Sequence, residues 1–290
     1  GEWTNQQEPV LIDSFSSEDP FVSVSAGLAN TCAVTRSGKA YCWGVHSQYG
    51  VIGDGTVFSV YEQPKQIDSI PGFDNITQMF SWLGSTNCAI DDIGNLGCWG
   101  DNHYGIIGDD TLENRYLFRS DSIYVHQTST FGGAVVDVNL AQRACALIDD
   151  GSIWCWGGSY TEGSVPEKVS QFGTNRVAVA FDDNGFFACA VEQTGHVSCW
   201  GNGESGTIGD GNWDNRDEPT RTQSFGPSLR AIDVKISLRT ACALVDTGQV
   251  YCWGLDHYGS LGDGGGDTTR NTPSLISTPL WGNRNATSIS

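Results

Sequence analysis

The sequence is poor in methionine and has no long apolar run. Its only methionine is Met79 and its first residue is Gly1, so we expect a processed chain or part of a longer one. No uninterrupted apolar stretch reaches about 20 residues, which excludes a transmembrane helix within these residues. A signal peptide is absent, as it is from any secreted chain that has already been processed.

Basic residues are also scarce. There are 15 Lys and Arg residues against 34 Asp and Glu residues, so the formal net charge is −19. Nucleic acid binding requires a basic footprint, and we therefore expect no nucleic acid partner. An acidic surface keeps a protein soluble, and it also attracts cations or a basic partner.

Helical periodicity and catalytic motifs are missing as well. The 37 glycines are too many for a helical protein and suit a fold with many tight turns. No Ser-His-Asp grouping, HExxH helix or phosphate-binding glycine loop occurs. We therefore expect a non-enzymatic protein without a cofactor.

All ten cysteines form five pairs, each ten residues apart and each followed by Trp-Gly. No C-x-x-C motif occurs, and the five histidines follow no ligand spacing, which disfavours zinc. Structural cysteines that stay reduced are the other alternative to disulfides. The pairs are Cys32 and Cys42, Cys88 and Cys98, Cys145 and Cys155, Cys189 and Cys199, and Cys242 and Cys252.

The spacing of each pair predicts a β-hairpin with a disulfide. If residues 36–38 form a three-residue loop, Cys32 faces Cys42, and Gly38 takes the left-handed position that such a loop requires. Opposed β-carbons lie about 4.5–5.5 Å apart, which is within reach of a disulfide bond. Five such bridges predict an oxidising compartment, and we expect a secreted, extracellular protein.

The hairpins recur every 44 to 57 residues. Each is preceded by a β-branched stretch and followed by a polar loop, usually with a Gly-Asp turn, and most units then show a Pro-led strand. Small four-stranded sheets at this period are typical of propeller blades. We predict one all-β propeller domain over 1–290, with extra strands at 8–15 and 286–290. The expected repeats are 21–75, 76–134, 135–176, 177–230 and 231–285.

Two of the copies carry a family resemblance. The segments ANTCAVTRSGKAYCWGVHSQYGVIGDGT (29–56) and TACALVDTGQVYCWGLDHYGSLGDG (240–264) resemble the repeat of the regulator of chromosome condensation family. The third copy departs from the pattern, because it continues after Gly158 as SYTEGSVPEKV. The resemblance implies a propeller and a role in binding, as an exchange factor, an inhibitor or an interaction platform.

The cysteine pairs fit poorly with an exchange factor of the nucleus or cytosol. We predict instead an extracellular glycoprotein that binds a protein or glycan, or assembles head to tail with copies of itself into a filament. Surplus terminal strands that pair with a neighbour would link such a filament. The alternative is a secreted hydrolase or lyase with its site at the central opening.

A few residues outside the hairpins are candidate sites. Exposed indoles anchor interfaces, so the partner-binding candidates are Trp82, Trp213 and Trp281. N-glycosylation sequons begin at Asn75 and Asn285. We expect no bound metal; the nearest pattern is a calcium-loop start at Asp210, Asn212 and Asp214. Asn215 and Arg221 stand where such a loop needs glycine and glutamate.

The repeat tryptophans are expected to pack between blades rather than to bind a partner. They are Trp43, Trp99, Trp156, Trp200 and Trp253.

Overall fold

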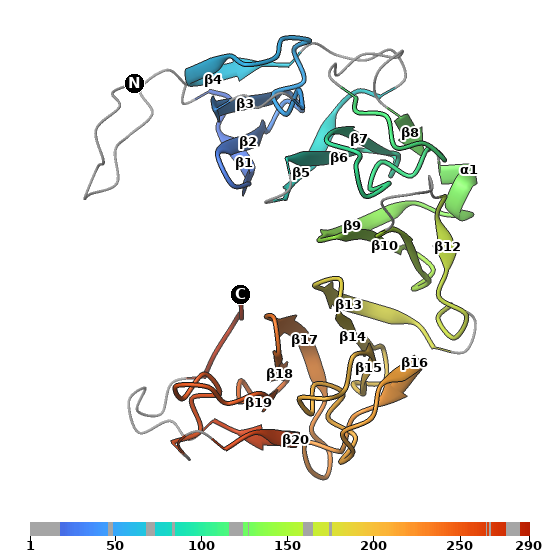
Figure 1. Cartoon of the computed structure of the whole chain (residues 1–290), viewed down its shortest axis with the longest axis vertical. Helices are drawn as coiled ribbons and strands as arrows, with labels where there is room; N and C mark the ends of the chain where they lie inside the picture. The colour runs from blue at the N-terminus through green and yellow to red at the C-terminus, as the bar shows by residue number, and fades with distance from the viewer. Residues whose placement is uncertain are drawn as a thin grey trace. The chain divides into compact units, whose positions relative to one another are not determined.

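The protein is built from five four-stranded antiparallel sheets, which we call blades 1 to 5 (Figure 1). The computed structural model describes residues 18–45, 49–67, 73–82, 85–115, 124–126, 128–158, 165–173, 176–264, 266, 268–276 and 285–290. Among these residues, no helix is long and apolar enough to cross a membrane. The predicted all-β fold of four-stranded blades is confirmed.

Within each blade the strands follow one another in sequence order as a meander. Blade 1 contains β1 (Phe21–Ala26), β2 (Asn30–Thr35), β3 (Ala40–Val45) and β4 (Val60–Gln66). Blade 2 contains β5 (Ile76–Ser81), β6 (Thr86–Asp91), β7 (Leu96–Gly100) and β8 (Tyr124–His126), and the short helix α1 (Thr128–Phe131) follows it.

The remaining three blades repeat this plan. Blade 3 contains β9 (Val135–Leu140), β10 (Arg143–Ile148), β11 (Ile153–Gly157) and β12 (Glu167–Lys168). Blade 4 contains β13 (Ala178–Asp183), β14 (Phe187–Glu192), β15 (Val197–Gly201) and β16 (Arg216–Arg221). Blade 5 contains β17 (Ala231–Ile236), β18 (Thr240–Val245), β19 (Val250–Gly254) and β20 (Arg270–Leu275).

The second and third strands of each blade form the hairpin that the cysteine spacing predicts. In blade 1, Cys32 lies opposite Cys42, and the backbone N–H of Thr35 donates to the carbonyl of Lys39 across the turn. Gly38 has a φ of 81°, and a β-carbon there would lie 2.6 Å from the α-carbon of Asn75. A left-handed backbone and a close neighbour therefore both require glycine in this turn.

Three of the repeat tryptophans, Trp99, Trp156 and Trp253, contact a loop of the preceding blade, as predicted. The indole N–H of Trp99 donates to the Val51 carbonyl at 3.1 Å, and that of Trp253 donates to the Thr207 carbonyl at 2.8 Å. Both acceptors occupy the same position in a Gly-x-Ile-Gly-Asp loop of the preceding blade. A buried indole N–H needs such a partner, so the loop fixes where the next blade packs.

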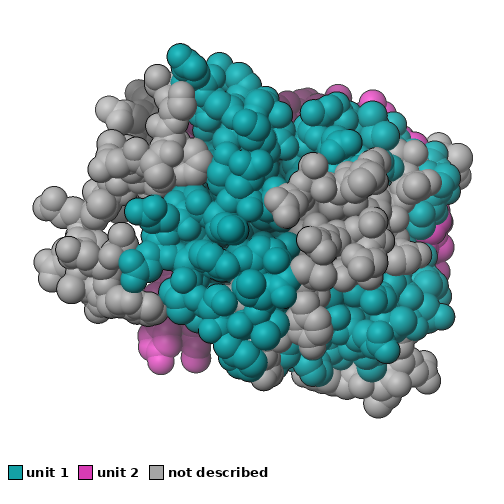
Figure 2. Space-filling model, turned by 90° about the horizontal axis from the view of Figure 1, so that it is seen from above, with its two compact units in different colours: residues 1–149, 155–167 teal, residues 150–154, 168–290 magenta. Residues whose placement is uncertain are grey.

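The chain divides into two compact units, which Figure 2 colours separately. The first comprises residues 1–149 and 155–167, and the second comprises residues 150–154 and 168–290. The first unit has a core around Trp99, and the second has a core around Trp253 between blades 4 and 5.

The two predicted extra strands have different outcomes. Residues 8–15 lie outside the described part of the chain. Residues 286–290 do not form a strand, although the Ala286 N–H donates to the Gly248 carbonyl at 2.9 Å. The first residue of an inner strand makes the same bond elsewhere, as Ile76 does to Gly38. A first strand needs a hairpin with which to form hydrogen bonds. Each of the five hairpins already pairs with the first strand of its own blade, so none is left for residues 286–290.

A meander of four strands has two distinct ends. The turn from the first to the second strand and the loop from the third to the fourth strand lie at one end, which we call the loop end. The turn between the second and third strands lies at the other, which we call the hairpin end. This polarity is the same in all five blades because all have the same strand order.

Candidate interaction surface

Large apolar side chains are exposed at the loop end of three blades. Leu28 in blade 1 and Leu238 in blade 5 are each 73% exposed, and Phe186 in blade 4 is 53% exposed. All three lie at the tip of the turn between the first and second strands of their blade. A turn tip gains nothing locally from an apolar side chain, so the two exposed side chains of the second unit, Phe186 and Leu238, point to an interaction surface there.

Phe186 and Leu238 share one hollow in the second unit. Its volume is about 210 Å³, and the exposed charged side chains of Glu204 and Arg239 also line it. The Asn184 side-chain amide donates to the Ser237 carbonyl at 2.5 Å and thereby joins the two turns. The hollow therefore combines two apolar walls with one charge of each sign.

The backbone beside this hollow is held by a half-buried carboxylate. Asp182, near the end of β13, accepts the N–H of Ile236 in β17 at 2.9 Å. Burial raises the pKa of Asp182 above its usual value, and the hydrogen bonds from Ile236 and Asp183 only partly oppose this. The inner strands of blades 4 and 5 are joined here, so the two turns above them are anchored together.

Of the three tryptophans predicted to bind a partner, Trp82 and Trp213 do not line this hollow. Trp213 is 48% exposed in the loop of blade 4 that precedes β16, which is at the loop end. Trp82 is half-buried and its ring packs edge-to-face on Tyr104 with centroids 5.9 Å apart. Trp281 lies outside the described residues. The partner-binding role of these residues stays a prediction.

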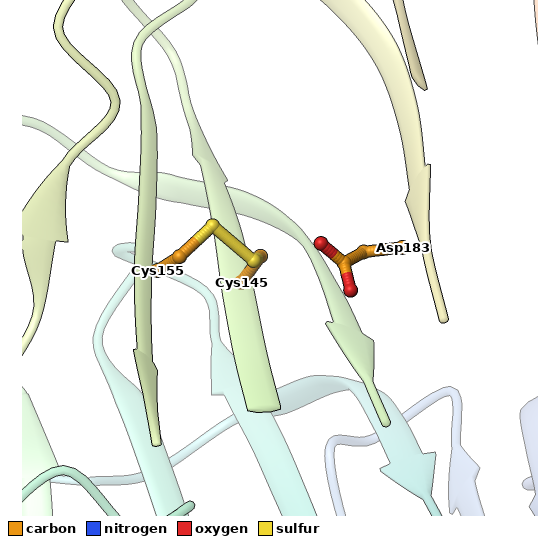
Figure 3. Close-up of side chains that lie close together, drawn as sticks. All are labelled: Cys145, Cys155 and Asp183. Carbon is orange, nitrogen blue, oxygen red and sulfur yellow. A yellow bond between two sulfur atoms is a disulfide. The ribbon is translucent and has the colours of Figure 1, made fainter. Parts of the chain in front are cut away.

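The ten cysteines form five disulfides in the pairing expected from the sequence. Each joins directly opposed residues with α-carbons 4.1 Å apart, and the described residues include no free cysteine. Figure 3 shows the bridge between Cys145 and Cys155. Its sulfur atoms are bonded to each other, so they are not thiolate ligands for a metal. Asp183, also drawn there, accepts the N–H of Gly185 at 2.6 Å within β13 and its turn.

The calcium-loop segment in blade 4 is occupied by protein contacts. Asp210 accepts the Asn212 N–H through Oδ1 at 2.9 Å, and its Oδ2 accepts the guanidinium of Arg216. Burial alone would raise the pKa of Asp210, but these hydrogen bonds outweigh it and hold that pKa below its usual value. The carboxylate of Asp214 is 78% exposed. The geometry is that of a turn closed by an ion pair.

The two sequons lie at equivalent places, at the hairpin end. Asn75 and Asn285 are exposed, and each directly precedes the first residue of an inner-strand segment, Ile76 or Ala286. Asn75 has a φ of 51°, and its amide donates to Asp92 Oδ2 at 3.0 Å. Both asparagines are therefore at the opposite end of the blade from the exposed apolar turns.

The sequence analysis did not identify Leu28, Phe186 or Leu238. The available signal was an apolar residue at the tip of a predicted polar turn, in segments such as SAGLAN and ISLRTA. That signal is informative only when the positions of the turns are known, because a leucine beside a β-branched stretch is otherwise predicted to belong to the strand.

Sequential four-stranded blades with Trp-Gly hairpins define a repeat protein of the β-propeller class. Models of the regulator of chromosome condensation (RCC1) repeat match residues 21–50 and 231–260, and a second model of that repeat matches residues 247–290. The chain therefore belongs to the RCC1-like β-propeller family.

Known proteins agree with this assignment. The chain is 30% identical over 257 residues to human E3 ubiquitin-protein ligase HERC2. The matched region makes up 84% of this chain but only 5% of HERC2. The structure of human WBSCR16 superposes with a TM-score of 0.73 at 21% identity, covering 92% of this chain and 70% of that one. The structure of Prp20p from Saccharomyces cerevisiae superposes with a TM-score of 0.70 at 16% identity, covering 90% of this chain and 64% of that one. Prp20p is described together with its binding to Gsp1p and histones.

Proposed function

We propose that this chain is a protein-binding module that engages its partner at the loop end of its blades. The observation that carries the proposal is the hollow between blades 4 and 5, with Phe186 and Leu238 exposed on its walls. Membership of a family of interaction modules supports it, and Prp20p is one relative described as binding other proteins.

The chemistry of the hollow defines the partner. Full burial of a leucine or phenylalanine side chain contributes about 1.5–3 kcal/mol, so Phe186 and Leu238 together suffice for a hot spot. Glu204 and Arg239 at the rim fit a partner with an apolar side chain flanked by one basic and one acidic residue. The net charge of −19 favours approach of a partner that is basic overall.

The environment that we propose is extracellular. Five disulfides, eight of whose ten cysteines are buried, suit an oxidising compartment, and two exposed sequons suit passage through a secretory pathway. A glycan at Asn285 would lie at the hairpin end of blade 5 and leave the hollow at the loop end of blades 4 and 5 accessible. The role that we propose in this environment is binding and not catalysis.

The proposal is tested with paired variants of the disulfide-bonded chain. F186S/L238S removes both apolar walls, whereas I93S removes an apolar side chain that is 64% exposed in a hairpin-end turn. A partner recovered by cross-linking from the native extracellular fluid should bind F186S/L238S at least tenfold more weakly and I93S unchanged. Equal binding to all three proteins would contradict a loop-end site.

A second proposal is self-assembly, which rests on the last blade. Residues Ala286 and Ile289 pack against a buried cluster of blade 5 that includes Val250 and Leu261. A hollow of about 440 Å³, lined in part by Val250, Ile276 and Ile289, lies beside this segment. An edge strand from another copy is the occupant that we propose.

Electron microscopy of the native, unconcentrated protein tests the self-assembly. Fibres that disappear in the variant V250D would support it, because a charge in this hollow opposes docking of an apolar strand. The circular dichroism of V250D must match that of the unmodified protein, because loss of fibres supports docking only if the variant is folded. Single particles at every concentration would contradict assembly and leave the loop-end proposal unaffected.

A further inference from the structure

One buried carboxylate in blade 5 has an oxygen atom without a partner. Asp256 is 1% exposed and follows β19 in the loop after Trp253 and Gly254. Its Oδ1 accepts the N–H of Leu261 at 3.1 Å. Its Oδ2 is buried and has no hydrogen bond. A buried polar atom without a hydrogen bond costs about 1–3 kcal/mol, so a ligand that pairs with this oxygen would stabilise the loop.

In blade 2, Asn102 occupies the position equivalent to Asp256. Asn102 Oδ1 accepts the N–H of Ile107 at 2.9 Å, as Asp256 Oδ1 accepts that of Leu261. The Nδ2 of Asn102 then donates to Asp109 Oδ1 at 3.3 Å and to the Thr111 carbonyl at 3.0 Å. The second atom of this side chain therefore faces the acid of the Gly-Asp turn.

The corresponding acid in blade 5 is Asp263. Arg270 donates to Asp263 Oδ2 at 3.0 Å, just as Arg115 pairs with Asp109 in blade 2. In blade 2 the asparagine, the aspartate and the arginine sum to zero charge. In blade 5 the asparagine is replaced by Asp256, so the same group carries one uncompensated negative charge. A donor has been replaced by an acceptor that faces an acid.

We propose that a calcium ion binds between Asp256 and Asp263, at the place that the asparagine amide fills in blade 2. Calcium prefers carboxylate and carbonyl oxygens at 2.3–2.6 Å, and adjacent oxygens on such an ion lie roughly 3.3–3.6 Å apart. The matching separations around Asn102 Nδ2 are 3.0 and 3.3 Å. Two carboxylate oxygens at nearly this separation would suit one calcium ion, with water completing the coordination.

This site is independent of the proposed partner surface. It also differs from the calcium-loop segment of blade 4, where Gly203 stands at the position of Asp256 and Arg216 balances Asp210. Among the described blades, blade 5 is thus the one in which the equivalent group contains two carboxylates and one arginine. Calcium bound here would tie the loop at 255–264 to the outer strand β20 through Arg270.

The test compares the unmodified protein with D256N and N102D. D256N places asparagine at the position where blade 2 has Asn102, so the variant should fold. Isothermal titration with calcium chloride should show one site in the unmodified protein with a Kd of about 10⁻⁴–10⁻³ M. D256N should show none, and its unfolding temperature in EDTA should be higher than that of the unmodified protein. N102D should show one additional site, because it reproduces the blade 5 arrangement in blade 2.

Three results would overturn the proposal. The first is an unfolding temperature of the unmodified protein that is equal in EDTA and in 10 mM calcium, with no heat of binding. The second is a calcium response that D256N retains. The third is an N102D variant that shows no additional calcium site. Magnesium chloride at the same concentration is the control for ionic strength.

Discussion

At the scale of single residues, blades 1, 2, 4 and 5 share one arrangement around the glycine of Trp-Gly. The residue that pairs with this glycine on the outer strand is Arg115, Arg216 or Arg270 in blades 2, 4 and 5. Each arginine binds the aspartate of the Gly-Asp turn. In blade 1 the partner is Tyr61, whose hydroxyl donates to Asp54 and whose pKa is raised by that hydrogen bond.

A second ion pair lies at the hairpin end of blade 4. The Glu192 side chain is 2% exposed, and it accepts hydrogen bonds from Arg221 at 2.6 and 3.1 Å and from Ser198 at 2.7 Å. Burial would raise the pKa of Glu192, but these bonds outweigh it and hold that pKa below its usual value. Because the pKa is lower in the folded state, the stabilisation is present above the unfolded-state pKa and is lost as the pH falls through the folded-state pKa.

We predict that E192Q is less stable than the unmodified protein at pH 7 by about 1.5–3 kcal/mol, since a charged acceptor of several hydrogen bonds is lost. The difference should shrink when the pH falls below about 4, where the unmodified protein also protonates Glu192. Chemical denaturation at several pH values measures it. D217N, at an exposed carboxylate of β16, should show no such pH-dependent difference. A constant difference across the range would refute the assignment.

At the scale of elements, the disulfide hairpin is the unit that repeats. Both strands of the β14–β15 hairpin are almost wholly buried, and Cys189 lies directly opposite Cys199. The outer strand is more variable: β16 has six residues, whereas β12 has two. Blade 3 lacks the Gly-Asp loop, and in blade 4 the ring of Trp200 packs on Phe172 with centroids 5.7 Å apart.

We predict that C189A/C199A lowers the free energy of unfolding by about 2–3 kcal/mol, because the bridge closes a small loop in the unfolded chain. Urea denaturation with the other four bridges intact measures the loss. Intact mass gives the matching control, since full reduction of the unmodified protein should add ten hydrogens for its five bridges. A chain that gains no hydrogens on reduction would rule out the disulfides and the compartment argued from them.

At the scale of the whole molecule, the two ends of the blades carry different chemistry. The sequons at Asn75 and Asn285 are at the hairpin end, and the exposed turns with Leu28 and Leu238 are at the loop end. Strand order alone imposes this division, because a meander returns its first and third connections to the same end.

We predict that the chain gains a glycan at both sequons when it is expressed through a eukaryotic secretory pathway. Treatment with a peptide amidase should convert Asn75 and Asn285 to aspartate, and peptide mass spectrometry would locate both changes. Protein expressed in bacteria provides the unglycosylated control. An unaltered mass at both sites would leave the compartment supported by the cysteines alone.

The sequence alone determined the five disulfide hairpins. The spacing of Cys32 and Cys42, with glycine six residues after the first cysteine, allows one register, and the structure has that register. Trp-Gly at the same offset in every copy located the packing tryptophans. These features are local, and a disulfide or a left-handed glycine constrains its neighbours without help from the rest of the fold.

Only the tertiary structure decided which side chains meet. Phe186 and Leu238 are 52 positions apart in the sequence, and their hollow exists because blades 4 and 5 pack through Trp253. Likewise, an aspartate at position 256 is unremarkable in an acidic sequence. It becomes informative when its buried oxygen is compared with the Asn102 amide, because burial and the loss of a donor arise from three-dimensional packing.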